Sequence, residues 1–262
     1  KFSELFKIVS YLRQVHEDYI GAGADVVTTN TFGTARHVLD QTEMREQVHE
    51  LNTAAVELAR EAREAAAPNH PVYIAGSIST SFLPDIPGSK KSDNYREQAT
   101  ILAEAGVDVL LLEMMENVGE ATLAIDAAVS TDLPTWVGYS CKLDEATSKL
   151  VLLEGEGEMF SEALASLLPL GDSLHFIMHT EVADTIPALS VLRQRSSSPL
   201  GVYPHSGRFI MPNWVFENII SPEEYAGEAL KWVEMGAQLV GGCCGIGPDH
   251  IRLLRQRLPT TV

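Results

Sequence analysis

The strongest chemical signal in the sequence is a pair of adjacent cysteines between glycines, in the run Val240–Gly245 (VGGCCG). Neighbouring residues on a regular strand point to opposite faces, but glycines at a strand end let the backbone turn, so both sulfurs could reach one metal ion. Two thiolates with a third nitrogen or sulfur ligand and an open position suit a catalytic zinc site. The alternative is that Cys243 and Cys244 are small buried residues at a junction between a strand and a helix.

Seven short runs rich in apolar residues predict the strands that would carry such a site. Most of them are almost continuously apolar, which is typical of parallel strands covered by helices. The predicted strands are Asp25–Thr31, Val72–Ile78, Val107–Met114, Pro134–Cys141, Leu174–Thr180, Leu200–Ser206 and Ala237–Cys244.

Longer stretches with helical patterns separate these strands. The phrases AEAGVDVLLLE and VEMGAQLVGG both run from a helix end, through a glycine, into a buried strand. The predicted helices are Leu5–Ala22, Glu43–Ala66, Tyr95–Ala105, Gly119–Val129, Phe160–Leu168, Thr185–Arg195 and Pro222–Met235. Ser81–Asn94 and Lys142–Glu158 are the candidates for mobile loops that follow strands.

Repeated β–α units without a break in composition predict one parallel α/β domain over residues 1–262. A doubly wound sheet is possible, but no G-x-G-x-x-G motif follows any predicted strand. We therefore predict a (β/α)8 TIM barrel. Such a barrel needs eight strands and the chain opens on a helix, so the first strand is expected to be missing from this chain.

In a barrel of this kind the active site is built at the C-terminal ends of the strands. The residues predicted to stand there are Asn30, Thr31, Ser77, Glu113, Cys141, His179, His205, Cys243 and Cys244. A carboxylate such as Glu113, at the end of the apolar run DVLLLE, would be costly to bury without a partner or a function. Ser77 could offer its hydroxyl group or its backbone N–H to a carboxylate.

The composition of the chain disfavours several classes of protein. The chain has 262 residues and a formal net charge of -17, which disfavours nucleic acid and anionic membranes as partners. Its 3 cysteines form no disulfide framework and suggest a reducing compartment. Apolar runs stay below the roughly 18 residues that a membrane-spanning helix needs, and the N-terminus lacks the pattern of a signal peptide. We expect a soluble, cytoplasmic protein of unknown oligomeric state.

Five segments, in their order and spacing, resemble the zinc-dependent homocysteine S-methyltransferase family: GADVVTTNTFGT, AGSI, AGVDVLLLE, YPHSG and GGCCG-x-x-P-x-H-I. The resemblance runs from Val15 to Leu258, and the block Gly241–Ile251 is its most specific part. It implies a (β/α)8 barrel that transfers a methyl group to the sulfur of homocysteine. The family holds zinc with a cysteine after the sixth strand and a cysteine pair after the eighth, and the pair corresponds to Cys243 and Cys244.

The resemblance also implies a pocket for homocysteine. The family uses the glutamate that matches Glu113 to hold the amino group of the substrate; otherwise Glu113 would be a capping or salt-bridging residue. Asn30 and Thr31 resemble residues of the substrate pocket, although an asparagine at a strand end is often only a turn former. Together with Ser77, these are the predicted acceptor-binding residues, and no side chain of the protein is expected to act as a covalent nucleophile.

The sequence departs from the family pattern at three places. The opening strand with its Asp-Gly-rich motif is absent, the family's Gly-Val-Asn-Cys reads Phe176–His179 (FIMH), and its Tyr-Pro-Asn reads Tyr203–His205 (YPH). His179 therefore stands where the first thiolate is expected. An imidazole binds zinc well, and two cysteines with one histidine form a known catalytic ligand set.

Three interpretations of the third ligand stay open. With His179 as a ligand, the Zn²⁺ centre would be neutral, which should lower the pKa of a bound thiol further but leave its sulfur less nucleophilic. Alternatively, Cys141 could supply a third thiolate from the end of the neighbouring strand. In the third interpretation His179 is a structural residue, and metal binding is weakened or lost.

We predict a methyltransferase that moves a methyl group from a small cationic donor to the zinc-activated thiol of homocysteine, giving methionine. The chain has no room for folate or cobalamin domains after its last strand, which favours a free donor such as S-methylmethionine, S-adenosylmethionine or a betaine. One alternative is a metal-free barrel of the same family that acts as a binding or regulatory protein. Another is an enzyme that uses selenohomocysteine or a different small thiol.

Overall fold

The computed structural model describes residues 2–67, 70–81, 86–171, 174–210 and 215–259. Seven of its strands join in one sheet, and each overlaps one of the predicted runs. These strands are β1 (Val26–Thr28), β2 (Tyr73–Ser79), β3 (Val109–Met115), β4 (Thr135–Tyr139), β7 (Leu174–Glu181), β8 (Leu200–His205) and β11 (Ala237–Val240).

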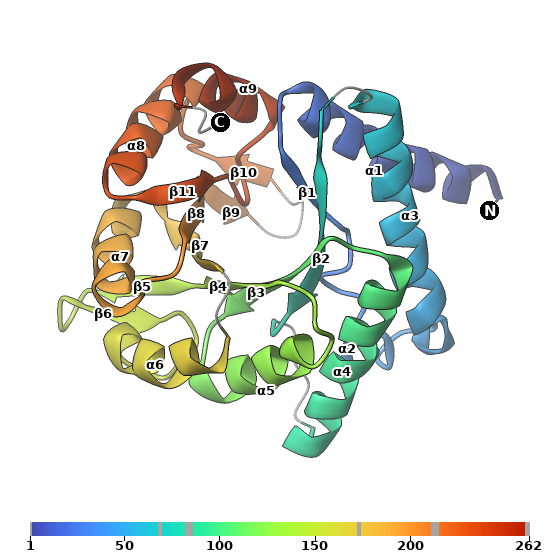
Figure 1. Cartoon of the computed structure of the whole chain (residues 1–262), viewed down its shortest axis with the longest axis horizontal. Helices are drawn as coiled ribbons and strands as arrows, with labels where there is room; N and C mark the ends of the chain where they lie inside the picture. Colours follow the sequence, from blue (N-terminus) through green and yellow to red (C-terminus); the bar gives the residue numbers. More distant parts are fainter. Residues whose placement is uncertain (1, 68–69, 82–85, 172–173, 211–214, 260–262) are drawn as a thin grey trace. The chain divides into compact units, whose positions relative to one another are not determined.

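At least one helix separates each strand of this sheet from the next (Figure 1). The helices are α1 (Phe2–Gly21), α2 (Arg36–Leu39), α3 (Val48–Ala66), α4 (Gly88–Ala105), α5 (Val118–Val129), α6 (Phe160–Leu167), α7 (Val182–Arg195), α8 (Pro222–Glu234) and α9 (Pro248–Arg257).

The strand order separates the two fold classes that the sequence left open. The order in the sheet is β1-β2-β3-β4-β7-β8-β11, so each strand lies beside the next strand of this sheet along the chain. A doubly wound sheet reverses its order at a switch point, whereas a barrel winds in one direction throughout. The predicted α/β barrel topology is therefore confirmed, with seven strands in the described part of the chain.

Contacts divide the chain into two compact units. Unit 1 comprises residues 1–113 and 122–136, and unit 2 comprises residues 114–121 and 137–262. The single domain over residues 1–262 stays a prediction.

In unit 1, helix α3 packs against α1 and against α4, and α3 and α4 also contact β2 (Figure 1). The buried side of α3 carries small residues, among them Ala59 and Ala62, which have no exposed surface. Small side chains let a helix approach its neighbours closely. The glutamates of α3 at positions 57, 61 and 64 are exposed. Strand β2 pairs in parallel with β1 and β3, and its residues Ile74–Ser79 are buried.

In unit 2, β8 pairs in parallel with β7 and β11, and helices α7 and α8 pack against these strands. Helix α8 begins at a capping box, in which Ser221 and Glu224 satisfy each other's backbone N–H groups. On its buried face, the hydroxyl group of Tyr225 donates to the carbonyl oxygen of Gly241 at 2.6 Å. This bond ties α8 to the segment that leads into the cysteine pair.

The predicted loop over Lys142–Glu158 is wrong in its first half. Strands β5 (Cys141–Asp144) and β6 (Lys149–Leu152) form an antiparallel hairpin there, and the carboxylate of Asp144 accepts hydrogen bonds from Thr147 in the turn. A second hairpin, β9 (Arg208–Ile210) with β10 (Val215–Glu217), follows β8 and was not predicted. Both hairpins are too short for their alternation to stand out in the sequence.

The predicted loop over Ser81–Asn94 is also partly helical, because α4 begins at Gly88. Residues 82–85 of this stretch lie outside the described residues. Pro87 precedes the helix, and a proline commonly stands at such a start.

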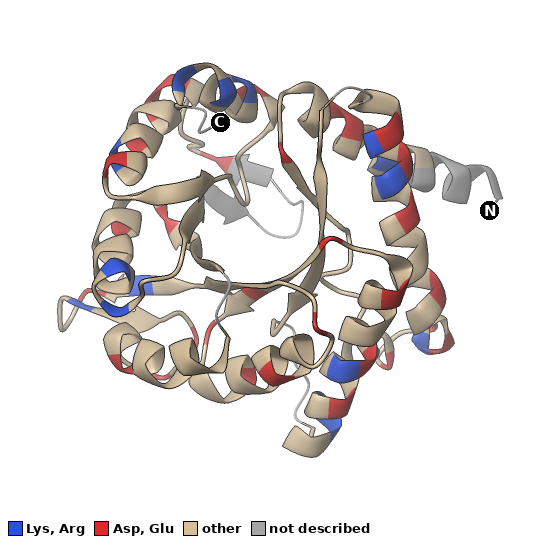
Figure 2. Ribbon diagram, in the orientation of Figure 1, with Lys and Arg blue, Asp and Glu red and all other residues tan. Residues whose placement is uncertain are grey.

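Charged residues lie mainly on the helices, while the strands of the sheet are almost free of charge (Figure 2). This distribution agrees with strands that are covered by helices. No helix within the described part of the chain combines the length and the apolar character that crossing a bilayer requires.

The packing of β7 against β8 makes a testable prediction about two glycines of unit 2. A Cβ atom at Gly201 would lie 2.2 Å from the ring of Phe176, whereas a Cβ atom at Gly227, inside α8, would meet nothing within 4 Å. Gly201→Ala should therefore lower the free energy of unfolding by about 1–3 kcal/mol through overpacking. Gly227→Ala, the matched control, should raise it by about 0.5–1 kcal/mol because alanine favours a helix.

Chemical denaturation of both variants measures these changes. A Gly201→Ala variant as stable as the wild type would show that Phe176 can move aside at little cost.

Candidate functional site

The cysteine pair stands in the turn between β11 and α9, and this turn is held by the end of β8. The backbone N–H of Cys243 donates to the carbonyl oxygen of Pro204 at 3.0 Å, and the N–H of Ser206 donates to the carbonyl oxygen of Cys244 at 3.0 Å. A third bond, from the N–H of Ile246 to the carbonyl oxygen of Cys243 at 3.1 Å, closes the turn. The backbone of both cysteines is thus held by hydrogen bonds to the end of β8 and by a bond within the turn.

Gly245 is required for this turn. Its φ of 80° lies in the left-handed region, and a Cβ atom there would stand 2.1 Å from the carbonyl oxygen of Ser206. No other residue type would fit without moving the backbone of β8's end or the turn itself. The backbone geometry of the turn therefore explains why a glycine follows the cysteine pair.

His179 reaches the cysteines from the end of β7, where the strand contains a bulge. Met178 pairs with Tyr203 and Glu181 pairs with His205, so three residue steps on β7 face two on β8. His179 lies in the bulge and adopts a φ of 42°, which is uncommon for a residue other than glycine. Bulges redirect side chains and are frequent beside active sites.

The three predicted metal ligands meet in unit 2. Nδ1 of His179 lies 3.5 Å from Sγ of Cys243, which lies 3.8 Å from Sγ of Cys244, and the potential ligand atoms all lie within 4.8 Å of one another. Zn–S bonds of about 2.3 Å and Zn–N bonds of about 2.0 Å, at tetrahedral angles, require separations of about 3.5 Å (N to S) and about 3.8 Å (S to S). The separations from Cys243 to His179 and to Cys244 therefore fit a tetrahedral zinc ion.

The electrostatics of the pair favour a thiolate. The S–H of Cys243 and the imidazole of His179, in that order of importance, hold the pKa of the Cys244 thiol well below its ordinary value through hydrogen bonds. Cys244 is exposed and Cys243 is half-buried. A thiolate at neutral pH is the form that both a metal and an electrophile require.

Cys141, the other candidate for a third thiolate, stands apart from this cluster. Its buried Sγ lies 3.7 Å from the hydroxyl group of Thr180, and it does not belong to the group of close ligand atoms. Burial raises the pKa of its thiol to about 12. A thiol that resists ionisation is a poor metal ligand, so the geometry favours His179 over Cys141.

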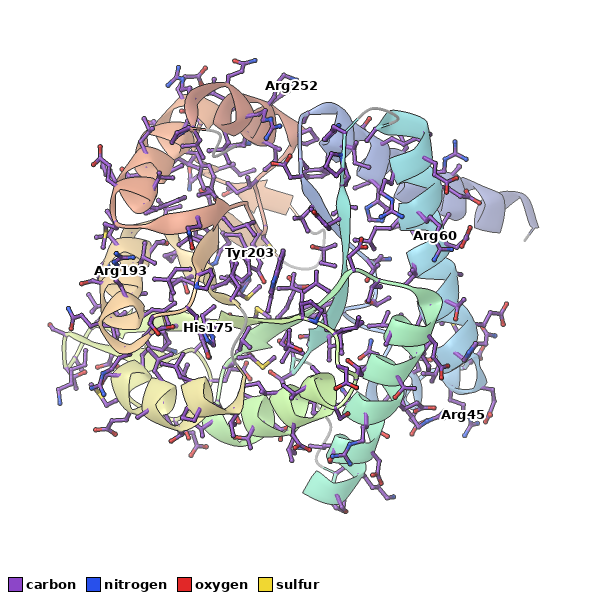
Figure 3. The ribbon with its side chains drawn as sticks, in the orientation of Figure 1. Arg45, Arg60, His175, Arg193, Tyr203 and Arg252 are labelled. Atoms are coloured by element: carbon purple, nitrogen blue, oxygen red, sulfur yellow. The ribbon has the colours of Figure 1, made fainter. Side chains whose placement is uncertain are left out.

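Other histidines of unit 2 have structural partners. Nδ1 of His250 accepts from the N–H of Gly247 at 3.2 Å, and its Nε2 lies 2.9 Å from the carbonyl oxygen of Ile220. His175, labelled in Figure 3, lies near the start of β7 with Nδ1 3.1 Å from the hydroxyl group of Tyr139. Each of these rings joins two segments of the fold.

The predicted acceptor-binding residues lie in unit 1, and three of them form one hydrogen-bonded group. The hydroxyl group of Ser77 donates to Oε2 of Glu113 at 2.5 Å, across the paired strands β2 and β3. The hydroxyl group of Thr31 donates to the carbonyl oxygen of Ser77 at 2.7 Å. The carboxylate of Glu113 thus has a partner, as its position at the end of an apolar strand requires.

Asn30 differs from these three residues because it is exposed, in the bend after β1. Thr29, which was not predicted, occupies the place in the group that was expected for Asn30. Its Oγ1 lies 2.8 Å from Oγ1 of Thr31 and accepts from the N–H of Ser77 at 3.1 Å. The alternation of buried and exposed residues in TNT was the signal that could have identified it.

Two buried amides from the helices also hold this loop, and no sequence pattern singled them out. Nε2 of Gln98 donates to the carbonyl oxygen of Thr31 at 2.8 Å. Nδ2 of Asn52 donates to the carbonyl oxygen of Thr34 at 3.0 Å, while Oδ1 of Asn52 accepts from the hydroxyl group of Thr34 at 2.8 Å. The backbone of the loop after β1 is therefore fixed by α3 and α4.

Comparison with known proteins identifies the family of this chain. The family model of homocysteine S-methyltransferases matches residues 3–258. The chain belongs to the homocysteine S-methyltransferase family. The resemblance expected from the sequence, and with it an enzyme of this family, is confirmed.

Individual relatives are moderately similar in sequence. A methionine synthase of Mycobacterium leprae is 29% identical over 254 residues, which cover 92% of this chain but 20% of that protein. A selenocysteine methyltransferase of Astragalus bisulcatus is 28% identical over 284 residues, covering 92% of this chain and 80% of that protein. Homocysteine S-methyltransferase 2 of Zea mays is 26% identical over 282 residues, covering 94% of this chain and 79% of that protein.

Solved structures show the same fold. The metallated form of the homocysteine methyltransferase MmuM from Escherichia coli is 25% identical, has a TM-score of 0.76, and is matched over 94% of this chain and 83% of that one. Its apo form is 26% identical with a TM-score of 0.71, over 94% and 84% of the two chains. MmuM, which has the same fold as this chain, has therefore been solved with a metal bound.

The electrostatics of unit 2 predict how its cysteines react with iodoacetamide once metal has been removed. Because thiolate is the reactive form, an ordinary thiol loses roughly a hundredfold in rate between pH 8 and pH 6. The lowered pKa of Cys244 keeps it ionised over this range, so its rate should change less than about twofold. Buried Cys141, with its raised pKa, should stay unmodified and serves as the internal control.

Peptide mapping of alkylated protein at several pH values checks this result. A hundredfold loss of Cys244 reactivity at pH 6 would contradict the predicted thiolate.

Proposed function

We propose that this chain is a zinc-dependent methyltransferase that transfers a methyl group from a small cationic donor to the thiol of homocysteine, giving methionine. The observation that carries the proposal is the cluster of His179, Cys243 and Cys244 in a member of the homocysteine S-methyltransferase family. Its separations of 3.5 Å and 3.8 Å from Sγ of Cys243 are those of a tetrahedral zinc ion. The reduced thiols that this chemistry needs agree with a cytoplasmic location, which we propose as well.

Three ligands leave one tetrahedral position for the substrate. His179, Cys243 and Cys244 would hold the metal, and the neutral imidazole with two thiolates would balance the charge of a divalent ion. When bound, a zinc ion lowers the pKa of a thiol in its open position, so that the thiol is ionised at neutral pH. The exposed position of Cys244 keeps this side of the centre accessible.

The hydrogen-bonded group of unit 1 is suited to the amino-acid part of homocysteine. The carboxylate of Glu113 could accept from the substrate's ammonium group while it keeps the bond from Ser77. The exposed amide of Asn30 and the fixed loop at Thr31 offer further polar contacts. These residues would bind and orient the acceptor without reacting themselves.

A cationic methyl donor agrees with the charge of the protein. The formal net charge of -17 attracts cations and would raise their concentration near the chain. S-Methylmethionine, S-adenosylmethionine and a betaine are the donors we propose to compare.

Metal content tests the proposal directly. Protein purified under reducing conditions without chelator should hold about one zinc ion per chain, and replacement of both Cys243 and Cys244 by serine should abolish it. His179→Ala should reduce bound zinc well below this value with the fold intact. His175→Ala, which removes a histidine of the same strand outside the cluster, is the matched control and should retain the metal.

Elemental analysis together with circular dichroism checks these variants. Wild-type protein that holds no zinc and takes up none would favour a metal-free binding protein. Full zinc in His179→Ala would show that another residue is the third ligand.

Glu113→Gln tests the acceptor pocket separately. The amide keeps the size of the side chain but loses the charge that attracts an ammonium group, so KM for homocysteine should rise roughly ten- to hundredfold. Zinc content should stay unchanged. Glu104→Gln, which removes an exposed carboxylate of α4 in the same unit, should leave KM at the wild-type value.

Initial rates over a range of homocysteine concentrations give this comparison. A loss of metal in Glu113→Gln would show instead that Glu113 supports the metal centre.

A further inference from the structure

A second histidine of unit 2 lies directly against the proposed metal ligand. His205, the last residue of β8, has its ring centroid 4.6 Å from that of His179, with an angle of 37° between the ring planes. The two rings are therefore in contact, tilted with respect to each other. The family pattern has an asparagine at position 205 and a cysteine at position 179, so both partners of this contact are departures from it.

A carboxylate holds the second histidine in place. Nε2 of His205 lies 3.1 Å from Oε1 of Glu181, the residue with which it pairs across β7 and β8. Since the carboxylate is an acceptor, Nε2 carries the proton of this bond. Nδ1 of His205 is buried and has no hydrogen-bond partner in the described part of the chain. The contact with Glu181 is thus the polar interaction that orients the ring.

His179 needs such a support more than an ordinary strand residue does. It sits in the bulge of β7 with a left-handed backbone, where regular strand neighbours do not confine its side chain. The polar contacts of the ring are to the cysteine pair: Nδ1 lies 3.5 Å from Sγ of Cys243, and the imidazole also hydrogen-bonds the thiol of Cys244. Packing against a second ring would fix the plane of the imidazole and so the direction of its Nδ1 lone pair.

We propose that His205 is a positioning residue for His179, and that Glu181 acts through His205. The proposal rests on the metal centre put forward above. Carboxylates and rings behind a metal ligand set its orientation, and their loss commonly lowers metal affinity ten- to hundredfold. In this chain the support runs from Glu181 at one side of the bulge, through His205 on β8, to His179 inside the bulge.

The experiment measures the affinity of metal-free protein for Zn²⁺ by competition with a chromogenic chelator, and the absorption spectrum of the Co²⁺-loaded protein. His205→Ala should lower the Zn²⁺ affinity ten- to hundredfold. His205→Phe keeps a flat ring and should stay within about threefold of the wild type, with an unchanged Co²⁺ spectrum because the ligands are the same. Glu223→Gln, which removes an exposed carboxylate at the start of α8, should have no effect.

A double-mutant cycle tests the order of action. Glu181→Ala should weaken Zn²⁺ binding a few-fold in the wild type and leave it unchanged in His205→Ala, because its effect passes through the ring. In the His179→Ala background, His205→Ala should change the affinity less than about twofold for the same reason. Circular dichroism identifies any variant that has not folded, and His205→Phe then carries the test.

Two results would overturn the proposal. If His205→Phe shifts the Co²⁺ spectrum, or His205→Ala still weakens binding in the His179→Ala background, His205 is itself a ligand. If His205→Ala binds Zn²⁺ as tightly as the wild type, the ring has no positioning role. Failure of the wild type to bind Zn²⁺ would instead remove the metal centre itself, and this inference with it.

Discussion

The candidate metal centre depends on one backbone constraint: two residues adjacent in sequence must place their sulfur atoms on the same side. An extended strand separates neighbouring side chains to opposite faces, so the chain has to leave the strand conformation directly after β11. It does so because Pro204 and Ser206 at the end of β8 bind the backbone of both cysteines, and because Gly245 accepts a left-handed conformation. The sulfur separation of 3.8 Å follows from this turn.

In the proposed centre, a histidine stands at the third position, where the family resemblance implies a cysteine. A histidine is longer than a cysteine, and its donor atom lies farther from the backbone. The bulge in β7 and the left-handed backbone of His179 adapt the strand end to this longer side chain. One imidazole and two thiolates also make the centre less anionic than three thiolates would, which favours ionisation of a bound thiol over its nucleophilicity.

In unit 1 the same physical problem, a polar group at the end of an apolar strand, is solved by hydrogen bonds. The carboxylate of Glu113 is satisfied by Ser77 on the neighbouring strand, and the loop at Thr31 is tied to Ser77 and to the buried amide of Gln98. A site whose polar groups are already held in place needs little rearrangement to bind an amino acid, which reduces the entropic cost of binding.

The features that could be predicted from the sequence are those that rest on local patterns. Continuous apolar runs defined the seven strands, helical periodicity defined the helices between them, and a glycine-flanked cysteine pair marked the candidate centre. Tertiary structure alone decided the bulge at His179, the exposure of Asn30, the separation of Cys141 from the cluster and the contact of Glu181 with His205. Each of these depends on hydrogen bonds or packing between segments far apart in the chain, and no pattern of neighbouring residues encodes such a pairing.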